Sequence, residues 1–400
     1  MDLKKNLSLT DLILLALGNI IGAGVFVILS KAIWIGKSST FYVFVLMAVL
    51  SILSGFTYSE ISAQYQSNTA ESDLLKDVYG PMVENIGGIL IYLFAIFSAA
   101  TIIVNLSKYA TKSYTTLLSI ALTLIIAAIN YAGIDTSKAV FNSIGVIMLI
   151  YLATFIFSSK ISLPTLSPPQ INPLLASSMF ALFLYNGYDA IVKVHDEVID
   201  PNQIPNAIMI SLTITTIIYI IISWITQQTL SAKQLSTTYT PLSDIFKINL
   251  TRYDLGKHAY QISFLVGLVI MFNTAFVSLL CGTRYMYGMA KTNHIPSIFA
   301  ETNRYHAPHY AIAISTLIML FFCIVNNENI AIIVTNVCVI LLLLLINAGL
   351  LVLRIKTPPK GYQMPLYVRG IPVLTLIPIL GFSILLVYSI INYSKYIYVN

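Results

Sequence analysis

The stretch "GNIIGAGVF", Gly18–Phe26, places three glycines inside the first long apolar run of the chain, residues 11–34. A run of this length is sufficient for a membrane-spanning helix, because about 20 apolar residues cross the hydrocarbon core. Each glycine costs a helix interior about 1 kcal/mol relative to alanine. The stretch therefore predicts either a spanning helix that is interrupted at its midpoint or a close helix-packing face, since Gly18 and Gly22 also fit the G-x-x-x-G pattern.

The composition of the whole chain indicates an integral membrane protein. Of its 400 residues, 57% are hydrophobic and 10% are charged, whereas a soluble domain carries roughly 25% charged residues. The net charge of +6 comes with lysines and arginines that mostly flank apolar runs, which is typical of spans and not of a nucleic-acid surface. The three cysteines lie within apolar runs, so no disulfide framework is expected. The absence of a P-loop, a dinucleotide fingerprint or a nucleophile–base arrangement argues against an enzyme and against an ATP-driven pump.

Eleven apolar runs are candidate spans, and they predict an all-α membrane bundle. The first run follows the short segment "MDLKK" and lacks a small-residue cleavage site, so we expect a retained span and not a signal peptide. The fourth and ninth runs are short, and the boundary between the ninth and tenth depends only on "NNEN", Asn326–Asn329. The predicted spans are residues 11–34, 41–63, 86–107, 115–131, 139–158, 174–194, 207–229, 260–289, 310–325, 329–353 and 371–392.

Three connections are long enough to carry structure of their own. Residues 64–85 contain an amphipathic stretch that predicts a short helix lying at the membrane surface. Residues 159–173 are rich in proline and predict an extended connector, and residues 230–258 predict a polar loop with one short helix. If the N-terminus is cytoplasmic, 12 of the 22 lysines and arginines lie inside or at inner ends of spans, which favours that orientation. The odd number of spans then leaves the C-terminal "NYSKYIYVN" outside.

A second interruption lies in the sixth run. Its centre, Tyr185–Asp189 ("YNGYD"), places an amide, a glycine and a carboxyl group within an apolar segment. Because the interrupted runs are the first and the sixth, the spacing predicts two five-helix repeats of opposite orientation with a binding site where the broken helices meet. The repeats would cover residues 1–158 and 174–354, and residues 371–392 would form an additional span.

The chemistry of such a break favours a zwitterionic ligand. Unwound backbone at membrane depth is tolerated only where it lines a cavity or meets a ligand. The free N–H groups and partial positive charge of a half-helix can hold a carboxylate, and the carbonyls of an opposing end can face an ammonium group or a cation. Gly22, Ala23 and Gly24 are small enough for a ligand to reach the main chain. Asp189 is a functional candidate because it is ionisable within a span, although an ion pair with Lys193, four residues further on, is the plainer interpretation.

Five motifs resemble those of the amino acid–polyamine–organocation transporters, from about residue 8 to residue 370. They are "IGAGVF" in the first span, "YSEISAQ" with Glu60 in the second, "INYAGIDTSKAVFNSIG" between the fourth and fifth, "YNGYDAIVKVHDEVIDPNQIPNAI" with Glu197 from the sixth, and "GTRYMYGMAKTNHIPSIF" with Arg284 at the end of the eighth. The resemblance implies a LeuT-like 5+5 inverted-repeat bundle with helices 1 and 6 broken, and transport by alternating access.

The resemblance also implies which residues bind substrate. The carboxylate of an amino acid would lie on the first-span glycines, its amine would lie near sixth-span carbonyls, and aromatic side chains of the sixth span would gate the site, although a plain packing role fits these aromatics equally well. The expected substrate-binding residues are Ile21, Gly22, Ala23, Gly24, Phe183, Tyr185, Asn186 and Gly187.

The coupling ion is left open between a proton and sodium. The resemblance implies that Asp189 carries a proton, whereas "GNIIGAG" is also similar to the first span of sodium-coupled symporters. The ion-coupling candidates are Asp189 for a proton, and Gly18, Ile21, Thr274 and Ser278 for sodium. Neither a bound cofactor nor a structural metal site is expected, and His306 and His309 in "HAPH" are interpreted as loop residues.

The sequence thus predicts a multi-pass secondary transporter of amino acids in the cell membrane, working by proton-coupled symport or exchange. It would bind a small amino acid or amine, lie in the lipid bilayer as a monomer or homodimer, and bind no nucleic acid. The alternatives are a polyamine or organic-cation carrier, in which Asp189 and Glu60 would face a second ammonium group, and a sensor of amino acids that has lost transport.

Overall fold

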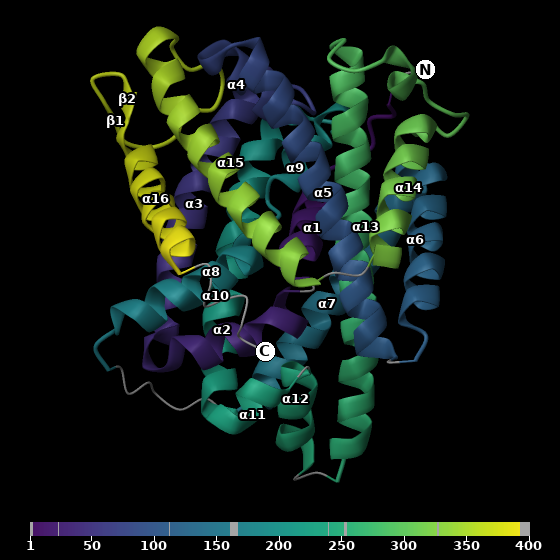
Figure 1. Cartoon of the computed structure of the whole chain (residues 1–400), viewed down its shortest axis with the longest axis vertical. Helices are drawn as coiled ribbons and strands as arrows, with labels where there is room; N and C mark the ends of the chain where they lie inside the picture. Colours follow the sequence, from purple (N-terminus) through teal and green to yellow (C-terminus); the bar gives the residue numbers. More distant parts are fainter. Residues whose placement is uncertain are drawn as a thin grey trace.

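The computed structural model describes residues 3–22, 24–111, 113–160, 167–238, 240–251, 254–325 and 328–392. This part of the chain is mostly helical, with a single two-stranded hairpin of Tyr367–Val368 (β1) and Ile371–Pro372 (β2) (Figure 1). Eight of its helical stretches are long and apolar enough to cross a membrane. The eleven predicted runs exceed this number because two of the corresponding helices are short and the sixth run is interrupted.

The first half of the chain contains the helices that the first four runs predict, together with a short helix between them. A capping box of Ser8 and Asp11 begins the first helix, and Pro81 at the first turn begins the fifth. The elements are α1 (Leu9–Ile20), a π-helix (Gly24–Ile28), α2 (Leu29–Gly36), α3 (Thr40–Tyr65), α4 (Ala70–Tyr79), α5 (Pro81–Ala110) and α6 (Thr115–Tyr131).

The second half contains the longest helix of the described residues, α13, which has 36 residues and therefore extends beyond the roughly 20 that cross a bilayer. The α-helices that follow α6 are α7 (Ile134–Ser158), α8 (Ile171–Tyr185), α9 (Ala190–Lys193), α10 (Ile204–Thr229), α11 (Ala232–Thr237), α12 (Pro241–Thr251), α13 (Gly256–Lys291), α14 (His309–Val325), α15 (Glu328–Lys356) and α16 (Leu376–Ile391).

The elements outside the bundle gather at its two ends. Figure 1 shows α4 and the β1–β2 hairpin at one end, near the N-terminus of the chain, and α11 and α12 at the opposite end. The two short helices α1 and α9 lie toward the first end, whereas α2 and α8 lie toward the second, where α2 packs on α8 and α11. Each interrupted run therefore changes from one half of the bundle to the other at its break.

Two expectations about the connections need correction. The helix predicted within residues 64–85 exists as α4, but it does not lie freely at the surface, because one face from Ala70 to Leu75 is buried against α3, α5 and α15. Residues 230–258 contain two helices, α11 and α12, where one was expected. In the proline-rich connector 159–173, residues 161–166 lie outside the described residues, as do residues 393–400 of the C-terminal segment.

Candidate functional site

The first run is interrupted at the glycine motif. Helix α1 ends at Ile20, and Ile21 caps it by donating its N–H to the Leu17 carbonyl at 2.8 Å. Regular structure resumes at Gly24 as a π-helix of five residues. Ala23, one of the predicted binding residues, lies outside the described residues. The helix interruption that the three glycines predict therefore lies between Ile20 and Gly24.

The second interruption follows Tyr185, the last residue of α8. Asn186 is extended, with φ −81° and ψ 149°, and Gly187 has φ +125°, a conformation that favours glycine. A Cβ atom on Gly187 would also lie 3.2 Å from the backbone nitrogen of Ile20. Position 187 therefore requires glycine both for its φ and because the two broken runs touch here, main chain against main chain.

Tyr219 of α10 shares its single hydroxyl proton between two carbonyl groups that the breaks leave free. Its hydroxyl lies 2.7 Å from the Ile20 carbonyl oxygen at the end of α1 and 2.9 Å from the Leu184 carbonyl oxygen at the end of α8. A helix ends with carbonyls that lack a partner within the helix, and leaving them unpaired in a buried place is costly. One fully buried hydroxyl thus joins the two helix ends.

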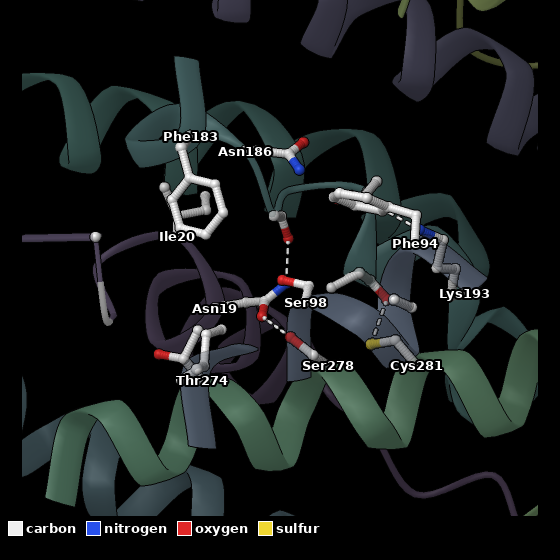
Figure 2. A pocket seen from close by; sticks show the side chains of 16 residues that line it. Asn19, Ile20, Phe94, Ser98, Phe183, Asn186, Lys193, Thr274, Ser278 and Cys281 are labelled. Carbon is white, nitrogen blue, oxygen red and sulfur yellow. Dashed lines mark hydrogen bonds and ion pairs between the residues drawn. The ribbon is translucent and has the colours of Figure 1, made fainter. Parts of the chain in front are cut away.

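A cavity lies between the two breaks, and α5 and α13 complete its walls (Figure 2). The α1 end contributes Asn19 and Ile20, and the other side of that break contributes Gly24. The broken sixth run contributes Phe183, Asn186, Gly187, Asp189, Ala190 and Lys193. Helix α5 contributes Phe94, Ala95, Ser98 and Ile102, and helix α13 contributes Thr274, Ser278 and Cys281.

Asn19 connects both breaks to α13. Figure 2 shows its side chain between the sixth run and Ser278: the amide nitrogen donates to the Gly187 carbonyl at 3.1 Å, and the amide oxygen accepts from the Ser278 hydroxyl at 3.2 Å. This residue is not among those predicted from the sequence. A polar amide inside an apolar run, directly after Gly18, is the signal that could have identified it.

We predict that Asn19→Ala destabilises the protein by about 1–3 kcal/mol, because the Gly187 carbonyl loses its buried donor. Transport should weaken as well, since the two breaks lose a connection at the cavity. Thermal unfolding of the purified protein measures the first effect. Asn202→Ala, which removes an exposed asparagine, is the matched control and should change stability by less than about 0.5 kcal/mol. Equal melting curves for Asn19→Ala and the unmodified protein would contradict the prediction.

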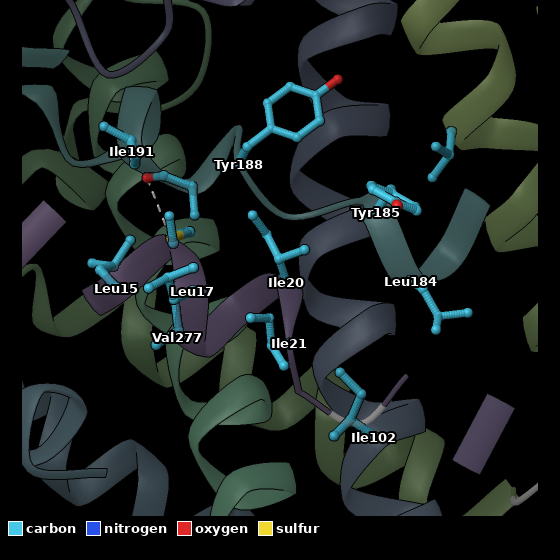
Figure 3. Packing of buried hydrophobic residues seen from close by; sticks show 14 of the residues in the cluster. Leu15, Leu17, Ile20, Ile21, Ile102, Leu184, Tyr185, Tyr188, Ile191 and Val277 are labelled. Atoms are coloured by element: carbon cyan, nitrogen blue, oxygen red, sulfur yellow. Dashed lines mark hydrogen bonds between the residues drawn. The ribbon is translucent and has the colours of Figure 1, made fainter. Parts of the chain in front are cut away.

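The predicted substrate-binding residues separate into two groups. Gly24, Phe183, Asn186 and Gly187 line the cavity, as described above. Ile21 and Tyr185 are fully buried in the hydrophobic cluster and are not among the cavity-lining residues of this structure (Figure 3).

Tyr185 and Gly22 make packing contacts instead. The Tyr185 hydroxyl donates to the Phe44 carbonyl at 3.2 Å, and its ring packs against Tyr219. Gly22 lies against α13 so closely that a Cβ atom would be 1.5 Å from the Thr274 hydroxyl oxygen. The packing interpretation of the glycine motif therefore fits Gly22, and the cavity interpretation fits Gly24.

The residues proposed for a sodium site partly come together. The Thr274 hydroxyl donates to the Gly18 carbonyl at 3.0 Å, and it also lies 3.2 Å from the Ile270 carbonyl. Ser278 lies one helical turn further along α13, where its hydroxyl contacts Asn19. Within the described ranges, no group of three or more His, Cys, Asp or Glu residues could hold a metal ion.

A buried cluster of charges borders the cavity on the α4 side. Lys193 forms an ion pair with Asp189, four residues before it, and both residues line the cavity. The carboxyl group of Glu71 on α4 lies 4.0 Å from the Lys193 ammonium group, and it accepts a hydrogen bond from Tyr58 at 3.0 Å. Glu71 and Lys193 are each only 2% exposed. The ion pair between Asp189 and Lys193, which is the plainer interpretation of Asp189, is thus present, and it forms part of the cavity wall.

Two further buried ion pairs lie outside the cavity. Arg284 of α13 binds Glu197 through contacts of 3.2 Å, and both side chains are fully buried. Arg354 of α15 binds Glu60, which also accepts the Met364 N–H at 2.9 Å. Glu60, which the polyamine alternative would direct toward a ligand, is therefore occupied by Arg354.

Comparisons with known proteins match transport proteins over most of the chain. A family model described as "Amino acid permease" matches residues 7–396. The chain is 24% identical over 409 residues to the branched-chain amino acid permease BcaP of Bacillus subtilis, which covers 93% of this chain and 85% of the relative. It is 22% identical over 347 residues to the inner membrane transport protein YbaT of Escherichia coli, covering 82% and 79%. It is 24% identical over 406 residues to the cystine/glutamate transporter of Pongo abelii, covering 92% and 78%.

Proposed function

The chain belongs to the amino acid permease family, and from this premise we propose that it is a secondary active transporter of amino acids that works by alternating access. Proton-coupled symport or exchange is the proposed mode. The observation that carries the proposal is the meeting of two interrupted helical runs at a buried cavity, with main chain from both breaks at its wall. Broken helices that meet at a cavity are the usual binding arrangement of secondary transporters.

The proposed architecture is the LeuT-like pair of inverted five-helix repeats. Residues 1–158 and 174–354 would be the repeats, residues 371–392 would be a further span, and about eleven helices would cross the membrane. The positions of the two breaks support this division, because the half-helices α1 and α9 lie toward one end of the bundle and α2 and α8 toward the other (Figure 1). We propose that the end with α4 and the hairpin is cytoplasmic, since the connection before and within the hairpin carries Lys356, Lys360 and Arg369 and no acidic residue.

The proposed binding mode places the substrate carboxylate at the start of the π-helix and its ammonium group near Asp189. Free backbone N–H groups at a helix start attract an anion, and Gly24 at that start is part of the cavity wall. The carbonyls near the end of α8 are partly engaged by Tyr219. The Asp189 carboxylate therefore offers the clearest acceptor for an ammonium group on the opposite side.

The cavity wall favours a neutral amino acid with an apolar side chain. Its apolar side chains are those of Ile20, Phe94, Ala95, Ile102, Phe183 and Ala190. Its charged groups, Asp189 and Lys193, form one ion pair and therefore cancel. A substrate of zero net charge with an aliphatic side chain, such as the branched-chain amino acids after which one relative is named, fits this lining without leaving a buried charge unpaired.

The same charges argue against the polyamine alternative. A polyamine needs two separate anionic partners, and the candidates for these roles in the sequence are Asp189 and Glu60. The first is paired with Lys193 and the second with Arg354. Asp189 can accept one ammonium group beside Lys193, as proposed for an amino acid, but the second ammonium group of a polyamine would have to displace Arg354 from Glu60, which is unfavourable.

Uptake into proteoliposomes tests the proposal. We expect labelled L-leucine, L-isoleucine or L-valine to accumulate when a proton gradient is imposed or when unlabelled amino acid is trapped inside, and labelled putrescine to remain outside. A sodium gradient in a parallel arm decides between the two coupling ions. Uptake of putrescine alone would replace the proposal by the polyamine carrier, and binding without uptake or exchange would replace it by the sensor.

A further inference from the structure

Among the buried acidic residues that the structure describes, Glu71 and Glu84 each have an oxygen without a hydrogen-bond partner. Glu84 has the His294 ring nitrogen 2.6 Å from that oxygen, whereas Glu71 has no such close group. Tyr58 donates to Oε1 at 3.0 Å, whereas Oε2 is buried and makes no hydrogen bond. The nearest cation to Oε2 is the Lys193 ammonium group at 4.0 Å, which is too long for a hydrogen bond. A buried carboxylate with an unpaired oxygen is strongly unfavourable, whereas a carboxylic acid in the same place is much less so.

The number of charges in the cluster also favours a protonated Glu71. Two carboxyl groups, Asp189 and Glu71, share one cation, Lys193. The shorter contact belongs to Asp189, so this pair is neutral, and an ionised Glu71 would give the buried cluster a net negative charge. The other titratable groups that interact with Glu71 are the tyrosine hydroxyls of Tyr58 on α3, Tyr188 after α8 and Tyr285 on α13, which add no positive charge.

We propose that Glu71 is the proton-binding site of this transporter, and that Lys193, which lines the cavity, links the proton on Glu71 to the state of the substrate site. The assignment differs from the sequence-based expectation that Asp189 carries the proton. Asp189 has the Lys193 cation at contact distance, whereas Glu71 competes for the same cation from 4.0 Å away. The link to transport rests on the proposed function, but the protonation of Glu71 does not.

The environment moves the titration of Glu71 toward neutral pH. Burial, with a smaller contribution from the Asp189 charge, raises the pKa of its carboxyl group from 4.5 to about 7, although Lys193 and the Tyr58 hydrogen bond act in the opposite direction. A group whose pKa is raised in the folded state gives its full stability below the unfolded pKa and loses it as pH rises through the folded pKa. Thermal stability should therefore decrease as pH rises from about 4.5 through about 7.

Infrared difference spectroscopy of the purified, lipid-reconstituted protein tests the proton site without any substrate. We expect the carbonyl stretch of a buried, protonated carboxylic acid that titrates near pH 7, and its loss in Glu71→Gln. The decrease in melting temperature through the same pH range should also be lost in Glu71→Gln. Glu84→Gln, which removes another glutamate of 2% exposure on α5, is the matched control and should leave the titrating band in place.

Substitutions of the two neighbours of Glu71, Asp189 and Lys193, should move the pH midpoint of the Glu71 titration in opposite directions. In Asp189→Asn, Lys193 has Glu71 as its remaining carboxylate partner, so the midpoint should fall by about 1–3 pH units. In Lys193→Met, the cluster loses its cation, so the midpoint should rise by a comparable amount. These variants keep the Glu71 side chain and remain informative if Glu71→Gln folds poorly.

Three outcomes would overturn the assignment. The titrating band could persist in Glu71→Gln, it could be absent from the unmodified protein below pH 7, or its midpoint could stay fixed in both partner variants. Uptake of labelled L-leucine, measured on the same preparations, separates this result from the proposed function. A band that behaves as expected in a protein without uptake or exchange would refute transport while leaving the proton site intact.

Discussion

Gly24→Leu is expected to reduce amino acid uptake by about 100-fold or more, because a displacement of about 1 Å at a binding site can cost that factor. Gly24 begins the π-helix and lines the cavity. A Cβ atom there would lie 3.3 Å from the Leu184 side chain. Since Gly24 lines the cavity, we expect the added carbon atoms of a leucine to extend into it. They would occupy the place proposed for the substrate carboxylate and cover the N–H groups proposed to bind it.

The experiment must separate a blocked cavity from a disturbed helix contact, and the chain offers a matched pair of glycines for this. A Cβ atom on Gly349 of α15 would lie 3.2 Å from the Leu74 side chain, which is as tight as the Gly24 contact but away from the cavity. Gly24→Ala and Gly349→Ala should therefore cost similar stability, while uptake should fall much more in Gly24→Ala. Equal uptake in the two alanine variants, or substrate affinity retained in Gly24→Leu, would show that Gly24 serves packing alone.

The local features of the fold were predictable because they depend on neighbouring residues. The run 115–131 predicted the bounds of α6, and the glycines of the first run predicted where α1 ends, since apolar length and backbone cost are properties of a short segment. The depth of α4 was not predictable in the same way. Its burial depends on α3, α5 and α15, which only the assembled bundle brings to it.

The candidate site was predictable only in part, and the aromatic residues show why. Phe183 and Tyr185 are two residues apart in a helix of 3.6 residues per turn, so they point about 200° apart and cannot both face one cavity. The sequence pattern indicated both, whereas Phe183 lines the cavity and Tyr185 packs against Tyr219. The amide of Asn19 inside an apolar run could have identified it as a candidate, but its pairing with Gly187, 168 residues away, has no local signal in the sequence.

Glu71 and Lys193 were not predicted as site residues for the same reason. Each resembles an ordinary charged residue near the end of a span, and the sequence indicated Lys193 only as a partner of Asp189. The third member of the cluster enters from α4, which follows the second span and was expected at the surface. The cluster of Glu71, Lys193 and Asp189 can therefore be recognised only once α4 is known to pack against α3, α5 and α15.

Arg284→Met is expected to destabilise the protein by about 3–5 kcal/mol, more than Asn19→Ala, because it leaves the Glu197 carboxylate buried without a counter-charge. Both side chains of the pair are fully buried. The main chain at Glu197 also holds the N-terminal segment, since its carbonyl accepts the N–H groups of Asn6 at 2.8 Å and Leu7 at 3.0 Å. Loss of the pair should therefore loosen the N-terminal segment together with the end of α13.

Thermal unfolding and protein yield measure the effect, and the double variant Arg284→Met/Glu197→Met gives the sharper result. Replacing both members of a buried pair by apolar residues of similar volume is often close to neutral, so the double variant should recover most of the lost stability. Lys4→Met breaks the pair with Asp135, whose members are 50% and 54% exposed, and should cost about 1 kcal/mol or less. If the double variant were as unstable as Arg284→Met, the cost would come from the shape of the arginine side chain, and the unpaired carboxylate would not be its cause.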